Sequence, residues 1–189
     1  MKTQKETFDI IFFARAGQGA KSTAEILAQA ALLEGKYVQA FPSFGPERSG
    51  APIQTYLRVG HAQIRTREPI TDPDMVVVLD ETILDSAVVT NNLTKDEFLV
   101  VNTRRSAKEI QTQINFSGKV FPVDADGISM DIIGQPRPNT VILGKLAKIA
   151  DVAKLGSVTE QFRNIFGEKL GPEMTGKNIQ AIEKAYDLI

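Results

Sequence analysis

Cysteine is absent from this sequence of 189 residues, and histidine occurs once, as His61. Without cysteine the chain cannot form disulfides, provide a thiol nucleophile or ligate an iron–sulfur cluster. A single histidine also excludes any metal site that needs two histidine ligands, and we assign His61 no role. If the protein serves redox chemistry, another chain must therefore carry the electrons.

Long apolar runs and an excess of either charge are also missing. No segment is long enough to span a bilayer, and the N-terminus lacks the features of a signal peptide, so a cytoplasmic location is expected. With 22 Lys and Arg against 23 Asp and Glu, the formal net charge is −1. This balance predicts no general affinity for nucleic acid or for anionic membranes. The length fits a single domain over residues 1–189.

The predicted elements indicate an α/β fold. An apolar strand at 7–13, a glycine-containing loop, a helix at 20–33 and a strand at 36–41 make a β-α-β unit. Further strands are expected at 53–59, 74–79, 98–101 and 119–123, the first of them half-exposed and paired in a hairpin with 62–66. Helices are expected at 139–150 with Asn139 as the N-cap, and at 158–166 and 172–188. We therefore predict a three-layer α/β/α sandwich with a mixed, mostly parallel sheet and a Rossmann-like start.

The loop after the first strand is the first candidate site, and it suits an anion. Glycines let backbone amides approach a ligand, and a helix start presents unpaired N–H groups. The candidate residues are Gly17, Gln18, Gly19, Lys21, Ser22 and Thr23. The alternative is that the glycines serve loop geometry alone, because the pattern is neither G-x-G-x-x-G nor a P-loop. A nicotinamide cofactor is disfavoured because no acidic residue ends the second strand to hold a ribose.

The segment FPSFGPERSGAP at residues 41–52 is the second candidate. Its prolines stiffen the backbone, so little entropy is lost when it holds one shape. Arg48 offers a planar set of donors for phosphate or carboxylate. The other candidates here are Ser43, Phe44, Gly45 and Glu47. The alternative is a stiff surface loop with a solvated Glu47–Arg48 pair. Asp80, after the strand at 74–79, is interpreted as a helix cap rather than as a metal ligand.

These segments carry a resemblance to a known family. Gly17-Gln18-Gly19, the run STAEILAQAALLEGKYVQAF, FPSFGPERSGAP and PNTVILG resemble the gamma subunit of pyruvate:ferredoxin oxidoreductase, in the 2-oxoacid:ferredoxin oxidoreductase family. The resemblance covers most of the chain. It departs from the usual pattern at Ala14 and Ala16, where glycines are common, and at Ser49, where a basic residue or glycine is usual.

The resemblance implies a multi-subunit enzyme that converts pyruvate, coenzyme A and oxidised ferredoxin to acetyl-CoA, CO2 and reduced ferredoxin. Thiamine diphosphate, Mg and [4Fe-4S] clusters would belong to partner subunits of the alpha, beta and delta types. This chain would be inactive alone, would help bind coenzyme A through the candidate residues and would have no catalytic or metal-ligating residues of its own. Two alternatives stay open: the equivalent subunit of an enzyme for branched-chain 2-oxoacids, 2-oxoglutarate or indolepyruvate, and a purely structural subunit.

Overall fold

A computed structural model of the chain describes residues 5–43, 52–91 and 93–188. Its core is a six-stranded sheet in the order β2-β3-β1-β4-β5-β6. The strands are β1 (Thr7–Arg15), β2 (Tyr37–Pro42), β3 (Pro52–Gly60), β4 (Met75–Val78), β5 (Phe98–Asn102) and β6 (Lys119–Val123). Neighbouring strands β1, β4, β5 and β6 are parallel, whereas β3 is antiparallel to both β1 and β2. The predicted mixed, mostly parallel sheet is confirmed.

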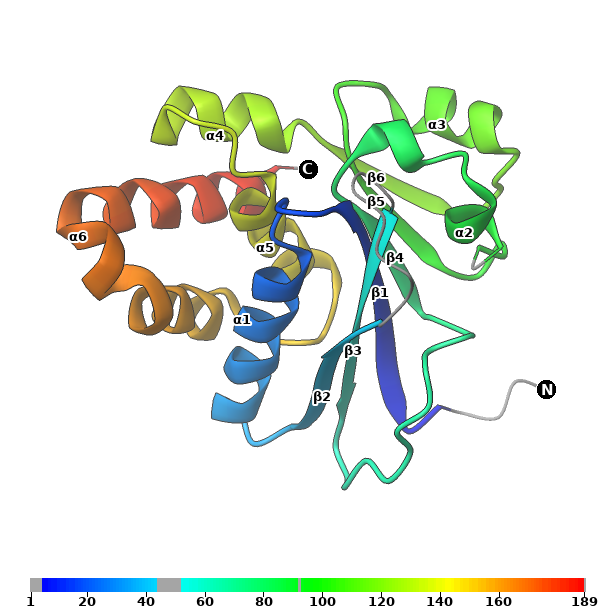
Figure 1. Ribbon diagram of the computed structural model, residues 1–189, viewed down its shortest axis with the longest axis horizontal. Coiled ribbons are helices and arrows are strands. Elements are labelled where there is room, and N and C mark those ends of the chain that lie inside the picture. The colour runs from blue at the N-terminus through cyan, green and yellow to red at the C-terminus, as the bar shows by residue number, and fades with distance from the viewer. Residues whose placement is uncertain (1–4, 44–51, 92, 189) are drawn as a thin grey trace.

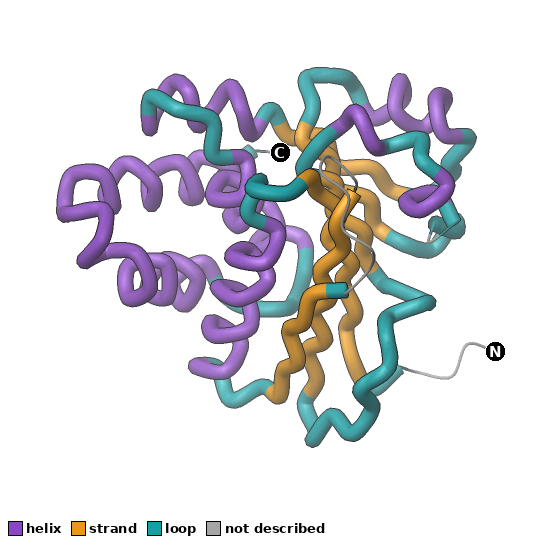
Figure 2. Tube along the Cα trace, in the orientation of Figure 1, coloured by secondary structure: helices purple, strands orange, loops and turns teal. Residues whose placement is uncertain are grey.

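Helices cover the sheet on both faces, as Figures 1 and 2 show. One face carries α1 (Ala20–Leu33), α4 (Ala125–Ile133), α5 (Pro138–Ile149) and α6 (Leu155–Asp187). The other carries the 3-10 turn η1 (Glu81–Ile83), α2 (Ala87–Thr90) and α3 (Ala107–Ile114). Successive β1 side chains serve opposite layers, because Phe12 belongs to the apolar cluster under α1, whereas Phe13 belongs to the cluster with Ile110 of α3. The three-layer α/β/α prediction is therefore confirmed.

The strand prediction for 53–59 needs two corrections. Residues 62–66 form no strand, because β3 already pairs with β1 on one edge and with β2 on the other. For the same reason β3 is an inner strand, and its residues 55–60 are buried rather than half-exposed. Arg58 is 6% exposed, and its guanidinium lies 3.3 Å from an Asp9 carboxylate oxygen and donates to the Glu68 carbonyl at 3.0 Å. Arg58 occupies a polar position in an alternating apolar–polar pattern, but that pattern wrongly predicted that its side chain is exposed.

The helix predictions hold in outline, with one cap misplaced. Helix α5 begins at Pro138, and its N-cap is Arg137, so Asn139 lies inside the first turn. Proline is favoured at the first helical position because its missing N–H has no intrahelical partner there. Asp80 caps η1, as expected, and its carboxylate accepts from the Thr82 backbone N–H at 3.0 Å. The short elements η1, α2, α3 and α4 were not predicted.

Helix α6 consists of two limbs separated at Gly171, whose φ of 75° and ψ of 166° are non-helical. Proline at position 172 then starts the second limb, which runs back along α5 (Figure 1). The two helices approach closely at Gly144, where an added Cβ would lie 1.8 Å from the carbonyl oxygen of Ile182. Among the described residues, no helix combines the length and the apolar character that a membrane span requires.

Candidate functional site

The loop of residues 16–19 joins the carboxyl end of β1 to the start of α1. Gly17 and Gly19 have φ values of 89° and 81°, a region that favours glycine over residues with a Cβ. The Gln18 backbone N–H donates to the Arg15 carbonyl at 3.2 Å and closes the turn. In open α/β sheets, ligands bind outside the carboxyl ends of the parallel strands, which is where this loop lies.

The Gln18 side chain is engaged within the protein. Its amide oxygen accepts from the Arg15 backbone N–H at 2.7 Å, and its amide nitrogen donates to an Asp80 carboxylate oxygen at 2.8 Å. Burial alone would raise the pKa of Asp80, but hydrogen bonds from Thr82 and Gln18 and the charge of Arg15 outweigh it and lower that pKa. Gln18 therefore ties the loop to the end of β4.

Helix α1 begins without a side-chain cap and without an acidic residue in its first turn. The Thr23 N–H bonds to the Gly19 carbonyl at 3.0 Å, so the amides of residues 20–22 precede the intrahelical ladder. Lys21 is exposed and forms no ion pair within the described residues, and Ser22 is half-buried. Thr23 departs from expectation, because it is buried and its hydroxyl bonds to the Gly19 and Asn139 carbonyls. Its hydroxyl is thus used inside the fold.

A second helix N-terminus lies against the first. The Asn139 side chain fills the space beside Gly19, where an added Cβ would lie 2.7 Å from the amide carbon of Asn139. Helix α5 also starts without a side-chain cap and without an acidic residue in its first turn. Each helix start carries about half a positive charge. Figure 1 shows the starts of α1 and α5 next to each other. Their free amides, with Lys21 and Arg137 nearby in sequence, make this region suited to an anion.

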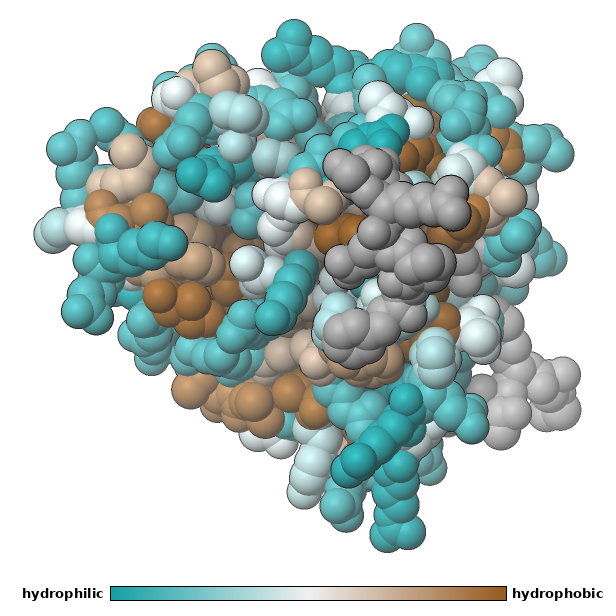
Figure 3. Space-filling view, viewed as in Figure 1, coloured by the Kyte–Doolittle hydropathy of each residue, from teal (hydrophilic) through white to brown (hydrophobic). Residues whose placement is uncertain are grey.

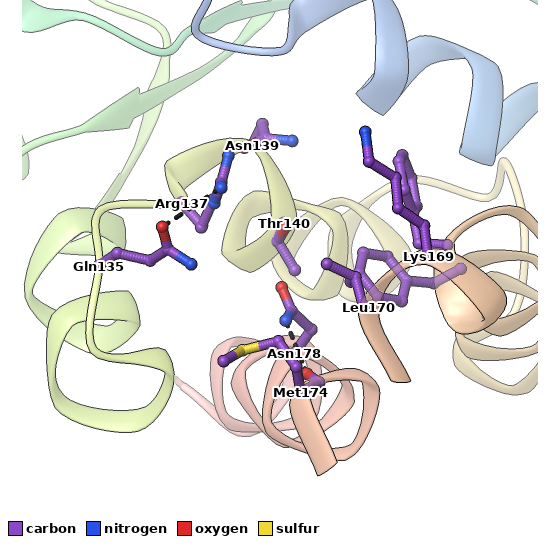
Figure 4. A pocket seen from close by; sticks show the side chains of 10 residues that line it. Gln135, Arg137, Asn139, Thr140, Lys169, Leu170, Met174 and Asn178 are labelled. Atoms are coloured by element: carbon purple, nitrogen blue, oxygen red, sulfur yellow. Dashed lines mark hydrogen bonds between the residues drawn. The ribbon is translucent and has the colours of Figure 1, made fainter. Parts of the chain in front are cut away.

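A pocket opens on the other side of Asn139, between the start of α5 and the two limbs of α6 (Figure 4). Its volume is about 150 Å³. The apolar walls are Phe162, Phe166, Leu170 and Met174, and the polar lining is Gln135, Arg137, Asn139, Thr140, Lys169 and Asn178. These residues were missed from the sequence, because they come from three separate segments and none of them forms a local motif.

The second predicted segment reaches the same edge of the sheet. Ser43 follows β2, is half-buried, and its backbone N–H donates to the Gln54 carbonyl at 2.9 Å. The register aligns Pro42 with Thr55 of β3 and Thr55 with Phe12 of β1, so β2 and β1 end on the same side. Phe44, Gly45, Glu47 and Arg48 lie outside the described residues, so their predicted roles stay predictions.

Comparison with known proteins gives a consistent result. Residues 9–188 match the family model described as pyruvate ferredoxin/flavodoxin oxidoreductase. Pyruvate synthase subunit PorC of Thermotoga maritima is 40% identical over 187 residues, which is 99% of this chain and 97% of the relative. A pyruvate/ketoisovalerate oxidoreductases common subunit gamma from Thermococcus kodakarensis is 44% identical over 180 residues, 95% of each chain.

Solved structures agree. The crystal structure of pyruvate oxidoreductase subunit PORC from Thermotoga maritima superposes with a TM-score of 0.85 at 38% identity, covering 97% of both chains. A 2-oxoglutarate:ferredoxin oxidoreductase from Magnetococcus marinus, solved with coenzyme A bound, has a TM-score of 0.77 over 96% of this chain and 31% of its own. Its identity is 19%, so this similarity concerns the fold alone.

Proposed function

Because the chain belongs to the pyruvate ferredoxin/flavodoxin oxidoreductase family, we propose that it acts as the gamma subunit of a multi-subunit pyruvate:ferredoxin oxidoreductase and contributes to coenzyme A binding there. Alpha, beta and delta-type subunits would be its partners, and ferredoxin would be reached through them. The absence of cysteine supports this division, because any [4Fe-4S] cluster must be held by another chain. Thiamine diphosphate and Mg are likewise assigned to the partners, and the cytoplasmic location stays a prediction.

One observation carries the coenzyme A proposal: two uncapped helix N-termini meet at the carboxyl edge of the sheet, beside an exposed lysine. Helices α1 and α5 touch through Gly19 and Asn139, and neither has an acidic residue in its first turn. Backbone amides and partial positive charge at a helix start favour phosphate. Coenzyme A carries several phosphate oxygens, and Lys21 adds a full charge next to those amides.

The contribution of this chain is binding and orientation. A carrier held by its phosphates presents its thiol to the acyl group in a restricted set of positions, which lowers the entropic barrier of the transfer. Gly17 is open to a ligand, because an added Cβ there would meet no atom within 4 Å. Gln18, through Arg15 and Asp80, fixes the loop that carries those amides. Ser43 and the predicted contact Arg48 would extend the same binding edge.

Steady-state kinetics of the assembled complex test this proposal. Lys21→Ala and Arg48→Ala are compared with Lys108→Ala, which removes an exposed lysine on α3 in the opposite helical layer. Loss of one phosphate contact is expected to raise the KM for coenzyme A about tenfold, with the KM for pyruvate unchanged. Lys108→Ala should leave both values unchanged. An unaltered coenzyme A affinity in both Lys21→Ala and Arg48→Ala would refute the proposal and favour a purely structural subunit.

A second candidate function has a specific observation in its favour. The Thermococcus kodakarensis relative, at 44% identity, is by name common to pyruvate and ketoisovalerate oxidoreductases. This chain could therefore serve a branched-chain 2-oxoacid enzyme as well as a pyruvate enzyme. Affinity purification of the tagged full chain, followed by identification of the co-purified subunits, distinguishes the two cases. Two sets of thiamine-binding subunits indicate a shared gamma subunit, and a single set rules it out.

A further inference from the structure

The pocket between α5 and α6 contains polar atoms that the fold leaves without partners. Thr140 is 3% exposed, and its hydroxyl forms no hydrogen bond with any described residue. Asn178 is 4% exposed; its amide nitrogen donates to the Met174 carbonyl at 2.8 Å, whereas its amide oxygen accepts from no described residue. Figure 4 shows the two side chains facing each other inside the pocket. Both residues are nearly buried and line the pocket, so their oxygens offer free hydrogen-bonding capacity that a ligand in the pocket can use.

The walls of the pocket suit a flat apolar ring. The rings of Phe162 and Phe166 lie 5.2 Å apart at an angle of 39°, and Leu170 and Met174 complete the apolar lining. A cavity of about 150 Å³ lined by apolar side chains holds one aromatic ring in other proteins. This pocket is partly open at its mouth, so a ligand there need not be confined to the enclosed volume. Figure 3 shows apolar surface between the limbs of α6, bordered by hydrophilic side chains.

The rim of the pocket is cationic. Arg137 and Lys169 line it, and both are exposed. Among the residues that the structure describes, no Asp or Glu lines the pocket. The Arg137 guanidinium donates to the Gln135 amide oxygen at 3.3 Å, and neither cation pairs with a carboxylate within the described part of the chain. The fitting ligand thus combines an aromatic ring that has hydrogen-bonding edges with an anionic tail.

We propose that this pocket binds the base of an adenine nucleotide. The exocyclic amino group of adenine would donate to the free amide oxygen of Asn178, and the Thr140 hydroxyl would donate to a ring nitrogen. Asn139 separates the pocket from Gly19, so phosphates attached to a base in the pocket face Arg137 and the two helix N-termini. The nucleotide is either the 3′-phosphoadenosine end of coenzyme A or a free adenine nucleotide. The first of these two assignments rests on the function proposed above.

Calorimetry on the assembled complex tests the pocket with adenosine 3′,5′-bisphosphate, ADP, guanosine 3′,5′-bisphosphate and pantetheine as probes. Thr140→Val removes the hydroxyl at nearly constant volume, and Arg137→Ala removes an exposed cation on the rim of the pocket. Each substitution is expected to weaken the binding of adenosine 3′,5′-bisphosphate about tenfold and to leave the affinity for pantetheine unchanged. The matched control Thr112→Val, on exposed α3, should bind every probe as the wild type does.

The outcomes separate this inference from the function proposed above. If neither variant weakens the nucleotide while Lys21→Ala still weakens coenzyme A, the pocket assignment is wrong and the subunit function stands. If Thr140→Val weakens adenosine 3′,5′-bisphosphate or ADP but coenzyme A fails to displace them, the pocket serves a free nucleotide and the coenzyme A proposal fails. Equal affinity for guanosine 3′,5′-bisphosphate would overturn the assignment to adenine.

Discussion

Gly144 is the position where a single methyl group should do most damage to the fold. An alanine Cβ there would lie 1.8 Å from the Ile182 carbonyl oxygen and 2.9 Å from the Tyr186 nitrogen. Both atoms are backbone, so no side-chain rotation relieves the contact. Ordinary contact begins near 3.4 Å, so α5 and the second limb of α6 must separate by about 1.6 Å. That separation loosens the packing of a seam whose α5 side is largely buried.

The size of the effect follows from two opposing contributions. Overpacking a core typically costs about 1–3 kcal/mol, occasionally more, and a contact with immovable backbone belongs at the upper end. Alanine in place of glycine inside a helix raises the free energy of unfolding by about 1 kcal/mol, because alanine has the higher helix propensity. We expect Gly144→Ala to lower the free energy of unfolding by about 2 kcal/mol, the difference between these two contributions. For a chain of this length, a loss of about 2 kcal/mol lowers Tm by about 4–8 °C.

Urea denaturation of the purified full chain, followed by circular dichroism, measures this loss. Gly176→Ala is the matched control, because Gly176 is also inside a helix but an added Cβ there meets nothing within 4 Å. The control should gain up to about 1 kcal/mol from helix propensity alone. If Gly144→Ala were as stable as the wild type while Gly176→Ala behaved as expected, the close approach of α5 and α6 described above would be wrong.

Two further predictions concern the loop and its support. Gly17→Ala should cost about 1–2 kcal/mol from left-handed backbone strain, whereas Gly19→Ala, which also meets Asn139, should cost about 2–5 kcal/mol in the same urea assay. Equal losses would contradict the Gly19–Asn139 contact. The pKa of Asp80 is lower in the folded chain than its ordinary value of 3.8, so its carboxylate stabilises the fold above that pH and the contribution is lost as pH falls through the folded value. Asp80→Asn should therefore lose less stability than the wild type between about pH 6 and about pH 3, and an identical loss would refute this reasoning.

The sequence by itself determined the fold class and located the glycine loop that is the first candidate site. Residues 10–14 are continuously apolar because they are buried on both faces, and residues 20–33 are mostly strong helix formers followed by a glycine, so both elements were predicted closely. Glycines at 17 and 19 predicted a tight loop because few other residues adopt positive φ. The lack of cysteine excluded clusters with no need of a structure. Each of these signals depends on residues that are close together in the sequence, so it can be recognised without knowledge of the fold.

Tertiary structure alone decided which polar residues are buried and which helix starts meet. Arg58 alternates like a solvent-facing residue, yet it is buried because β3 is inserted between β1 and β2. Thr140 and Asn178 are 38 positions apart, and only the return of α6 along α5 brings them into one pocket. Such residues come together because separate helices and strands pack against one another. A pattern within one helix or strand does not indicate which other element packs against it.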